Sequence, residues 1–150
     1  MVKIFFADGN KIGSIFIRTV TWSDFSHVGF IHDGMVIDSQ LFRGGVTSYD
    51  VAELVHHYPR IRVYEFPHVS AEAITYACEQ LGKKYDLAAL IGMGFQRNWQ
   101  EDDKWFCSEL VAASCAAAGT PIINKSTWRV TPQDVWECIA PGCVPSYQSQ

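Results

Sequence analysis

The spacing of the apolar residues changes about halfway along the chain. Up to Phe66, short apolar runs are separated by Gly, Asp, Asn and Pro, a pattern typical of β-strands joined by turns. After Ser70, apolar residues recur at helical spacing. Strands followed by helices, rather than alternating with them, predict an α+β domain with an antiparallel sheet.

The pattern also predicts individual elements. Strands are expected at residues 2–6, 13–20, 27–31, 35–38 and 60–66, and Asp33-Gly34 is a strong signal for a hairpin turn between the third and the fourth. Helices are expected at residues 71–81, 87–92 and 106–118, with a short one from Pro132 through Glu137. No repeat or linker divides the chain, so we expect residues 1–150 to form a single domain.

Composition and charge exclude several classes of protein. With 48% hydrophobic and 19% charged residues, the chain resembles an ordinary globular protein. A net charge of −4 and the lack of any Lys/Arg run argue against nucleic acid and anionic lipid as partners. No apolar run is long enough for stable membrane insertion, and we read no signal peptide, so the protein is expected to be cytoplasmic as synthesised.

The five cysteines are expected to remain thiols in a reducing compartment. No Cys-x-x-Cys pair is present, and the adjacent His56 and His57 would point apart on a helix. We therefore expect neither a metal nor another cofactor.

The most informative stretch surrounds Cys107, in Trp105-Phe106-Cys107-Ser108-Glu109. It places a cysteine in the first turn of an apolar helix, where free backbone N–H groups and the positive end of the helix dipole favour thiolate over thiol. The same N–H groups can hold the oxyanion that forms when a thiolate attacks an acyl carbon. The alternative is a buried structural cysteine, because free cysteine is among the most buried residue types.

A base for this nucleophile is available in His27, at the start of an expected strand. With Asp33 and Gly34 as turn residues, His27 shares a face of the hairpin with Asp38, diagonally at a Cβ separation of roughly 7–8 Å. A carboxylate there could fix the tautomer of the imidazole and stabilise imidazolium. Gln40, directly opposite His27, is the competing orienter.

These motifs resemble a known superfamily. The order Ser26-His27-Val28-Gly29, an acidic residue on the next strand, Gly82-x-x-Tyr85-Asp86 and then Phe106-Cys107-Ser108-Glu109-Leu110-Val111 is similar to the circularly permuted branch of the NlpC-type papain-like cysteine hydrolases. That branch includes lecithin:retinol acyltransferase-like enzymes and bacterial cell-wall hydrolase relatives, and histidine precedes cysteine in it, as here.

The resemblance covers residues 13–135 and implies a permuted papain-like fold, an antiparallel sheet or small barrel packed against a helical layer that carries the nucleophile. It implies Cys107 as nucleophile, His27 as base and Asp38 as the third polar residue. It also implies that Tyr85 lines the site and that Glu109 is structural. Further candidates for substrate contact are Trp105, Ser108 and Gln40.

The function expected is hydrolysis of an amide, in a peptidoglycan stem peptide, through an acyl-enzyme intermediate. The alternatives are an acyltransferase or thioesterase acting on lipid acyl groups, and a non-catalytic binding module on the same fold. The partner is expected to be a small peptide or acyl substrate, and the oligomeric state stays open. The lack of a signal fits a cytoplasmic enzyme, a phage-encoded one or one delivered separately to the cell wall.

Overall fold

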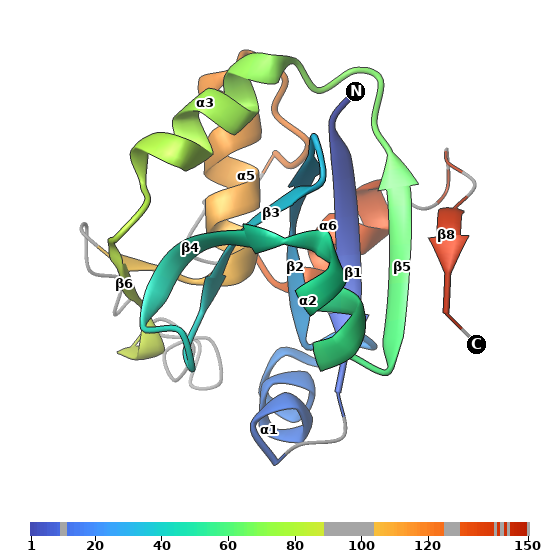
Figure 1. Cartoon of the computed structure of the whole chain (residues 1–150), viewed down its shortest axis with the longest axis vertical. Helices are drawn as coiled ribbons and strands as arrows, with labels where there is room; N and C mark the ends of the chain where they lie inside the picture. Colours follow the sequence, from blue (N-terminus) through green and yellow to red (C-terminus); the bar gives the residue numbers. More distant parts are fainter. Residues whose placement is uncertain are drawn as a thin grey trace.

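An open, eight-stranded sheet forms the centre of the molecule (Figure 1). The computed structural model describes residues 1–9, 12–88, 104–124, 130–139, 141, 143 and 145–149. The strand order is β7-β6-β4-β3-β2-β1-β5-β8, and the bounds are β1 (Lys3–Asp8), β2 (His27–His32), β3 (Met35–Gln40), β4 (Gly45–Asp50), β5 (Arg60–Glu65), β6 (Lys84–Tyr85), β7 (Lys104–Trp105) and β8 (Pro145–Gln148).

Neighbouring strands are antiparallel except for β6 and β7, which run parallel. The α+β class is therefore confirmed. Of the two expected forms, sheet or small barrel, the protein has the open sheet.

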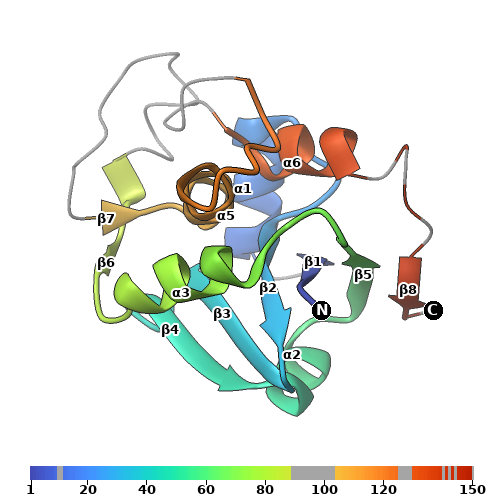
Figure 2. The ribbon, with the colours of Figure 1, turned by 90° about the horizontal axis from the view of Figure 1, so that it is seen from above.

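Helices cover both faces of this sheet (Figure 2). Seen from above, α3 (Ala71–Glu79), α5 (Cys107–Ala117) and α6 (Pro132–Ile139) lie on one face, and α2 (Val51–His57) lies on the other. Side chains alternate between the faces of a strand, and so they build two cores. The larger core lies under α3, α5 and α6 and includes Ile4, Phe6, Phe30, Ala77, Val111 and Val135; the smaller lies against α2 and includes Phe5, Ile31, Val36, Leu54 and Val63.

The β2–β3 hairpin has the register that the sequence predicts. Phe30 pairs with Ile37, and His32 pairs with Met35. Asp33 and Gly34 both have positive φ angles, of 48° and 79°, as a two-residue type I′ turn requires.

Residues 13–20 were expected to form a strand, and this prediction is wrong: they lie in helix α1 (Ile12–Thr21). Their β-branched residues favour a strand locally. However, β1 already has β2 on one side and β5 on the other, so no sheet edge is open to the segment that follows it. In the helix, the hydroxyl groups of Thr19 and Thr21 donate to the carbonyl oxygens four residues earlier.

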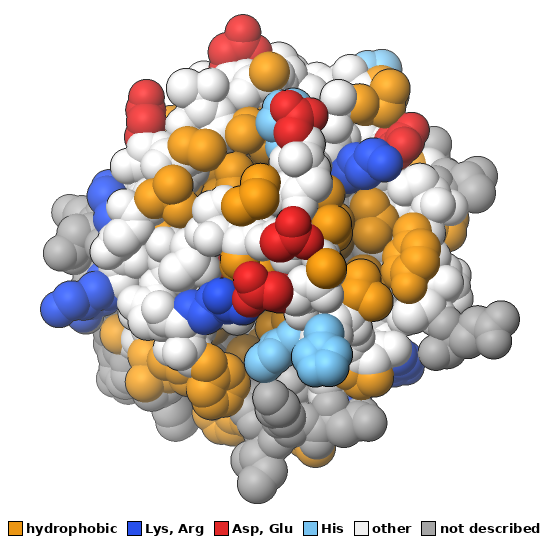
Figure 3. Space-filling view, viewed as in Figure 1, with side chains coloured by type: hydrophobic (Ala, Val, Ile, Leu, Met, Phe, Trp, Pro, Cys, Tyr) orange, Lys and Arg blue, Asp and Glu red, His pale blue; other side chains and the backbone are white. Residues whose placement is uncertain are grey.

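Three of the expected helices are present close to their predicted positions, as α3, α5 and α6. Most of the helix expected at residues 87–92 lies outside the described residues. The sequence did not predict α2 or the strands β4, β6, β7 and β8. None of the described helices has the length and apolar character needed to cross a bilayer. On the face that carries α2, Lys and Arg side chains are scattered among apolar and acidic ones (Figure 3).

Candidate active site

His27 and Asp38 meet on one face of the β2–β3 hairpin. The Nε2 atom of His27 lies 2.7 Å from Oδ2 of Asp38, and both side chains are buried. Gly29 lies between them. A Cβ atom on Gly29 would come within 2.7 Å of the Asp38 Cβ and within 2.7 Å of Cε1 of Phe5. The diagonal contact therefore depends on glycine at this position.

The Asp38 carboxylate is held by further donors. Its Oδ2 also accepts hydrogen bonds from Nε2 of Gln40 (2.8 Å) and from the Tyr49 hydroxyl (2.7 Å). Gln40 Nε2 donates to the Tyr49 oxygen as well, at 2.7 Å. Gln40 was expected to compete with Asp38 for His27; the structure instead places it on the carboxylate, where it orients Asp38.

Tyr49 comes from β4, and the sequence did not reveal it as a site residue. Burial, together with the nearby Asp38 charge and the hydrogen bond to Asp38, raises the pKa of Tyr49. Its hydroxyl therefore stays protonated and donates to the carboxylate.

The His27 ring contacts two aromatic rings. Tyr58 stacks on it, with ring centroids 5.5 Å apart and planes 9° apart, and Phe5 packs at 5.6 Å in a tilted arrangement. Burial acts to lower the pKa of His27. The Tyr58 oxygen, the Asp38 charge and hydrogen bonds to Asp38 and Cys107 oppose that effect, and the pKa is raised well above its ordinary value. The raised pKa makes His27 a stronger base for the Cys107 proton.

Cys107 is the first residue of α5, and its side chain interacts with His27 and helps to raise the pKa of the imidazole. Because Nε2 of His27 contacts Asp38, Nδ1 is the nitrogen left for the sulfur. The cysteine is only 1% exposed. The first-turn N–H groups of a helix have no carbonyl partner within the helix, so the nucleophile lies beside suitable donors for an oxyanion.

Glu109 supports the start of α5, as the resemblance implied. Its Oε2 accepts the backbone N–H of Phe106, the residue before Cys107, at 3.1 Å. Burial raises the pKa of Glu109 to about 7, opposed by that hydrogen bond and assisted by the charge of Asp86.

Two candidate substrate contacts do not face the site. Ser108 is fully buried, and its hydroxyl donates to the carbonyl oxygen of Val130 at 2.5 Å. Trp105 is also buried and packs with Val46 and Leu110. Both predictions are corrected, because proximity to Cys107 along the chain does not direct these side chains toward the cleft.

Tyr85, Gln40 and His27 line a cavity of about 90 Å³. The other lining residues were not found by sequence reasoning, and most are apolar: Ser14, Phe16 and Ile17 of α1, Ser26, Tyr58, Leu87, and Leu41 and Phe42 of the β3–β4 turn. Phe42 is 75% exposed, and Phe16, Leu41 and Leu87 are also exposed. The described part of this cavity therefore has an apolar rim. Within the described residues, no three His, Cys, Asp or Glu side chains are grouped so that they could hold a metal ion.

Comparison with known proteins shows what this chain is similar to. Residues 3–138 match the sequence model of a family described as "Permuted papain-like amidase enzyme, YaeF/YiiX, C92 family". Among solved structures, the chain is similar to one described as "Crystal structure of metalloprotein yiiX from Escherichia coli O157:H7, DUF1105". The TM-score is 0.70 and the identity 20%, over 97% of this chain and 95% of that one. No curated protein sequence matches significantly.

Proposed function

The chain belongs to the family of permuted papain-like amidases, which are cysteine hydrolases, and we propose that it cleaves an amide bond through an acyl-Cys107 intermediate. The observation that carries this proposal is the continuous connection from the Asp38 carboxylate through His27 to the Cys107 side chain. A nucleophile, a base and a group that orients the base are the three parts that such catalysis needs.

The reaction follows from these positions. The Cys107 proton moves to Nδ1 of His27, and the thiolate attacks the carbonyl carbon of the amide. First-turn N–H groups of α5 stabilise the oxyanion. His27 then protonates the leaving nitrogen as the C–N bond breaks. A water molecule, deprotonated by His27, attacks the thioester, and the acid product leaves as the thiol is restored. Throughout, Asp38 holds the imidazole and stabilises its charged form.

The first candidate substrate is an amide in a peptidoglycan stem peptide. The likeness of the Cys-Ser-Glu and Ser-His-Val-Gly motifs to those of bacterial cell-wall hydrolase relatives supports it. The small volume of the cavity beside His27, about 90 Å³ in its described part, suits a narrow peptide segment.

A second candidate is a substrate with a lipid acyl group, cleaved as an amide, ester or thioester. The specific observation in its favour is the apolar rim formed by Phe16, Leu41, Phe42 and Leu87. An alkyl chain that covers apolar side chains at the entrance removes their surface from water, which stabilises the complex by about 25 cal/mol per Å² of apolar surface buried.

The first experiment tests whether Cys107 is the nucleophile, without any assumption about the substrate. Iodoacetamide at mildly acidic pH should alkylate Cys107 far faster than the other cysteines, as read by peptide mass spectrometry. Cys78→Ser, at an exposed position of α3, is the matched control for Cys107→Ser. Equal alkylation rates at all five cysteines would contradict an activated thiolate.

Purified enzyme is then given a stem peptide and, separately, p-nitrophenyl esters of increasing chain length. Release of an amine from the peptide supports the first candidate, and rates that grow with chain length support the second. Binding of either without turnover would identify a non-catalytic module and overturn the proposal.

A further inference from the structure

A second cavity, of about 590 Å³, lies against α1, as does the cavity beside His27. Ile15, Arg18 and Thr19 line it, whereas Ser14, Phe16 and Ile17 line the first. The two linings share no residue. The remaining walls come from residues 23–25, from β5 and from the end of β8.

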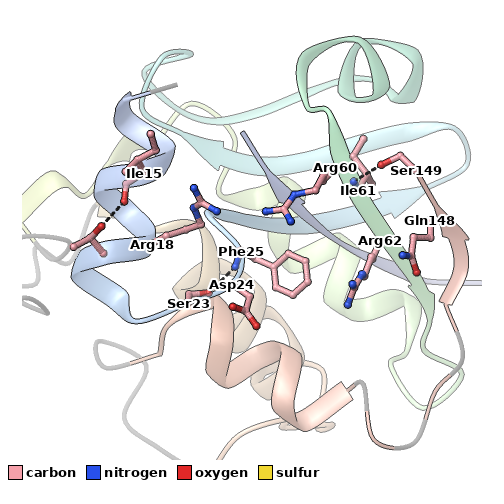
Figure 4. A pocket seen from close by; sticks show the side chains of 11 residues that line it. Ile15, Arg18, Ser23, Asp24, Phe25, Arg60, Ile61, Arg62, Gln148 and Ser149 are labelled. Carbon is pink, nitrogen blue, oxygen red and sulfur yellow. Dashed lines mark hydrogen bonds between the residues drawn. The ribbon is translucent and has the colours of Figure 1, made fainter. Parts of the chain in front are cut away.

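Three arginines surround this cavity. Arg18 comes from α1, and Arg60 and Arg62 come from β5, where a spacing of two places them on one face of the strand. Figure 4 shows the guanidinium groups of Arg18 and Arg60 pointing toward each other, while that of Arg62 lies near Gln148. The chain has a net charge of −4 and only 12 Lys and Arg residues, and three of these line this one cavity.

Carboxylates do not neutralise these charges completely. Asp8 is buried, and its Oδ2 accepts hydrogen bonds from both Arg18 and Arg60, so that one carboxylate serves two guanidinium groups. Asp24 lies at the rim and is exposed. Arg62 forms no ion pair with any carboxylate of the described residues, and its guanidinium carbon lies 5.6 Å from the centre of the Phe25 ring. The cavity keeps an excess positive charge.

The donors suit an oxyanion. A guanidinium group presents its N–H groups in a planar fork that matches a carboxylate or phosphate. Gln148, which pairs with Arg62 across β5 and β8, adds an amide at the same wall. The volume lies within the range of pockets for small molecules, roughly 300–1,000 Å³, so an anionic group would leave room for the rest of a ligand.

We propose that this cavity binds a small anionic ligand through its phosphate or carboxylate group, held by the guanidinium groups of Arg62 and Arg60. Arg18 completes the positive wall from α1. Neither Cys107 nor His27 lines this cavity, so the proposed anion binding can be tested independently of the amidase reaction.

The test is a titration of the ¹⁵N-labelled full chain, followed by NMR, with sodium phosphate and with sodium acetate at constant ionic strength set by sodium chloride. Saturable shifts of the Arg60, Arg62 and Gln148 amide signals are expected. Arg62→Gln should weaken binding roughly tenfold or more, since it removes charge-assisted hydrogen bonds. Lys3→Gln, which makes the same charge change outside this cavity, should leave the affinity unchanged.

The outcomes are distinct. Tighter binding of phosphate identifies a phosphorylated ligand, and tighter binding of acetate identifies a carboxylate. Cys107→Ala should bind either anion as the native chain does, which separates this result from any failure of the amidase proposal. The site does not exist if phosphate and acetate shift these amide signals no more than sodium chloride does at the same ionic strength. The same conclusion holds if Arg62→Gln and Lys3→Gln bind the anions with equal affinity.

Discussion

Replacement of Asp38 by Asn tests the support of the catalytic histidine with almost no change in shape. Asp38 is completely buried, and its Oδ2 receives hydrogen bonds from His27, Gln40 and Tyr49. An amide retains one oxygen acceptor but loses the negative charge. His27 then loses the partner that stabilises its charged form.

The expected loss can be estimated from this contact. A hydrogen bond between charged groups contributes about 1.5–3 kcal/mol. If it acts on the imidazolium formed during reaction, Asp38→Asn should lower kcat/KM by about 10- to 150-fold. The measurement is amide hydrolysis by the purified variants, with circular dichroism melting to show that each is folded. Asp33→Asn, an exposed position in the turn of the same hairpin, is the matched control and should keep native activity.

The pH profile gives a second readout of the same change. The Asp38 charge and hydrogen bond help to raise the pKa of His27 in the native protein. Without them the pKa of His27 falls, so imidazolium is lost at lower pH and the alkaline limb of activity should move toward acid. The reasoning would be refuted by a folded Asp38→Asn enzyme with an unchanged rate and an unchanged alkaline limb.

Three further changes probe the surroundings of this pair. Gly29→Ala would place a methyl carbon 2.7 Å from the Asp38 Cβ, and overpacking of this kind typically costs about 1–3 kcal/mol; urea unfolding should show the loss, and native stability would contradict the contact. Tyr49→Phe removes one charge-assisted donor to Asp38, so we expect kcat to fall roughly tenfold while the melting curve stays native. Full activity would show that the Tyr49 hydroxyl does not help to orient Asp38. Glu109 has a folded pKa of about 7 against an ordinary 4.5, so its favourable contribution is complete below about pH 4.5 and is lost as pH rises through 7. This difference in pKa corresponds to about 3 kcal/mol of folding free energy. Glu109→Gln should therefore remove this part of the pH dependence of stability, measured by urea unfolding. The variant should be as stable as the native chain at pH 4 and more stable than it at pH 8.

The parts of the site that the sequence predicted depend on local signals. Asp33-Gly34 sets the turn and therefore the hairpin register, and the register brings Asp38 to His27. The position of Cys107 at a helix start follows from the apolar helix after it. Both inferences need only a few consecutive residues.

The parts that were missed or wrong depend on distant segments. Residues 13–20 form a helix because other strands occupy both sides of β1, which no local pattern records. Tyr58, at the end of α2, was also missed. Here the sequence did hold a local signal, because Asp50 is a preferred N-cap residue, and in the structure its side chain accepts the Ala52 N–H at 2.7 Å. Trp105 illustrates another limit, because adjacency along the chain does not determine which way a side chain faces.

The order of the site residues along the chain also bears on how the enzyme is made. One continuous segment of about a fifth of the sequence contains His27, Asp38, Gln40, Tyr49 and Tyr58, and Cys107 follows about 50 residues later. At about 5–20 residues per second, a ribosome needs roughly 2–10 s to add that interval. The nascent chain thus carries the histidine and its carboxylate before any nucleophile exists. Hydrolytic activity begins only when the second half has been synthesised and α5 has docked onto the sheet.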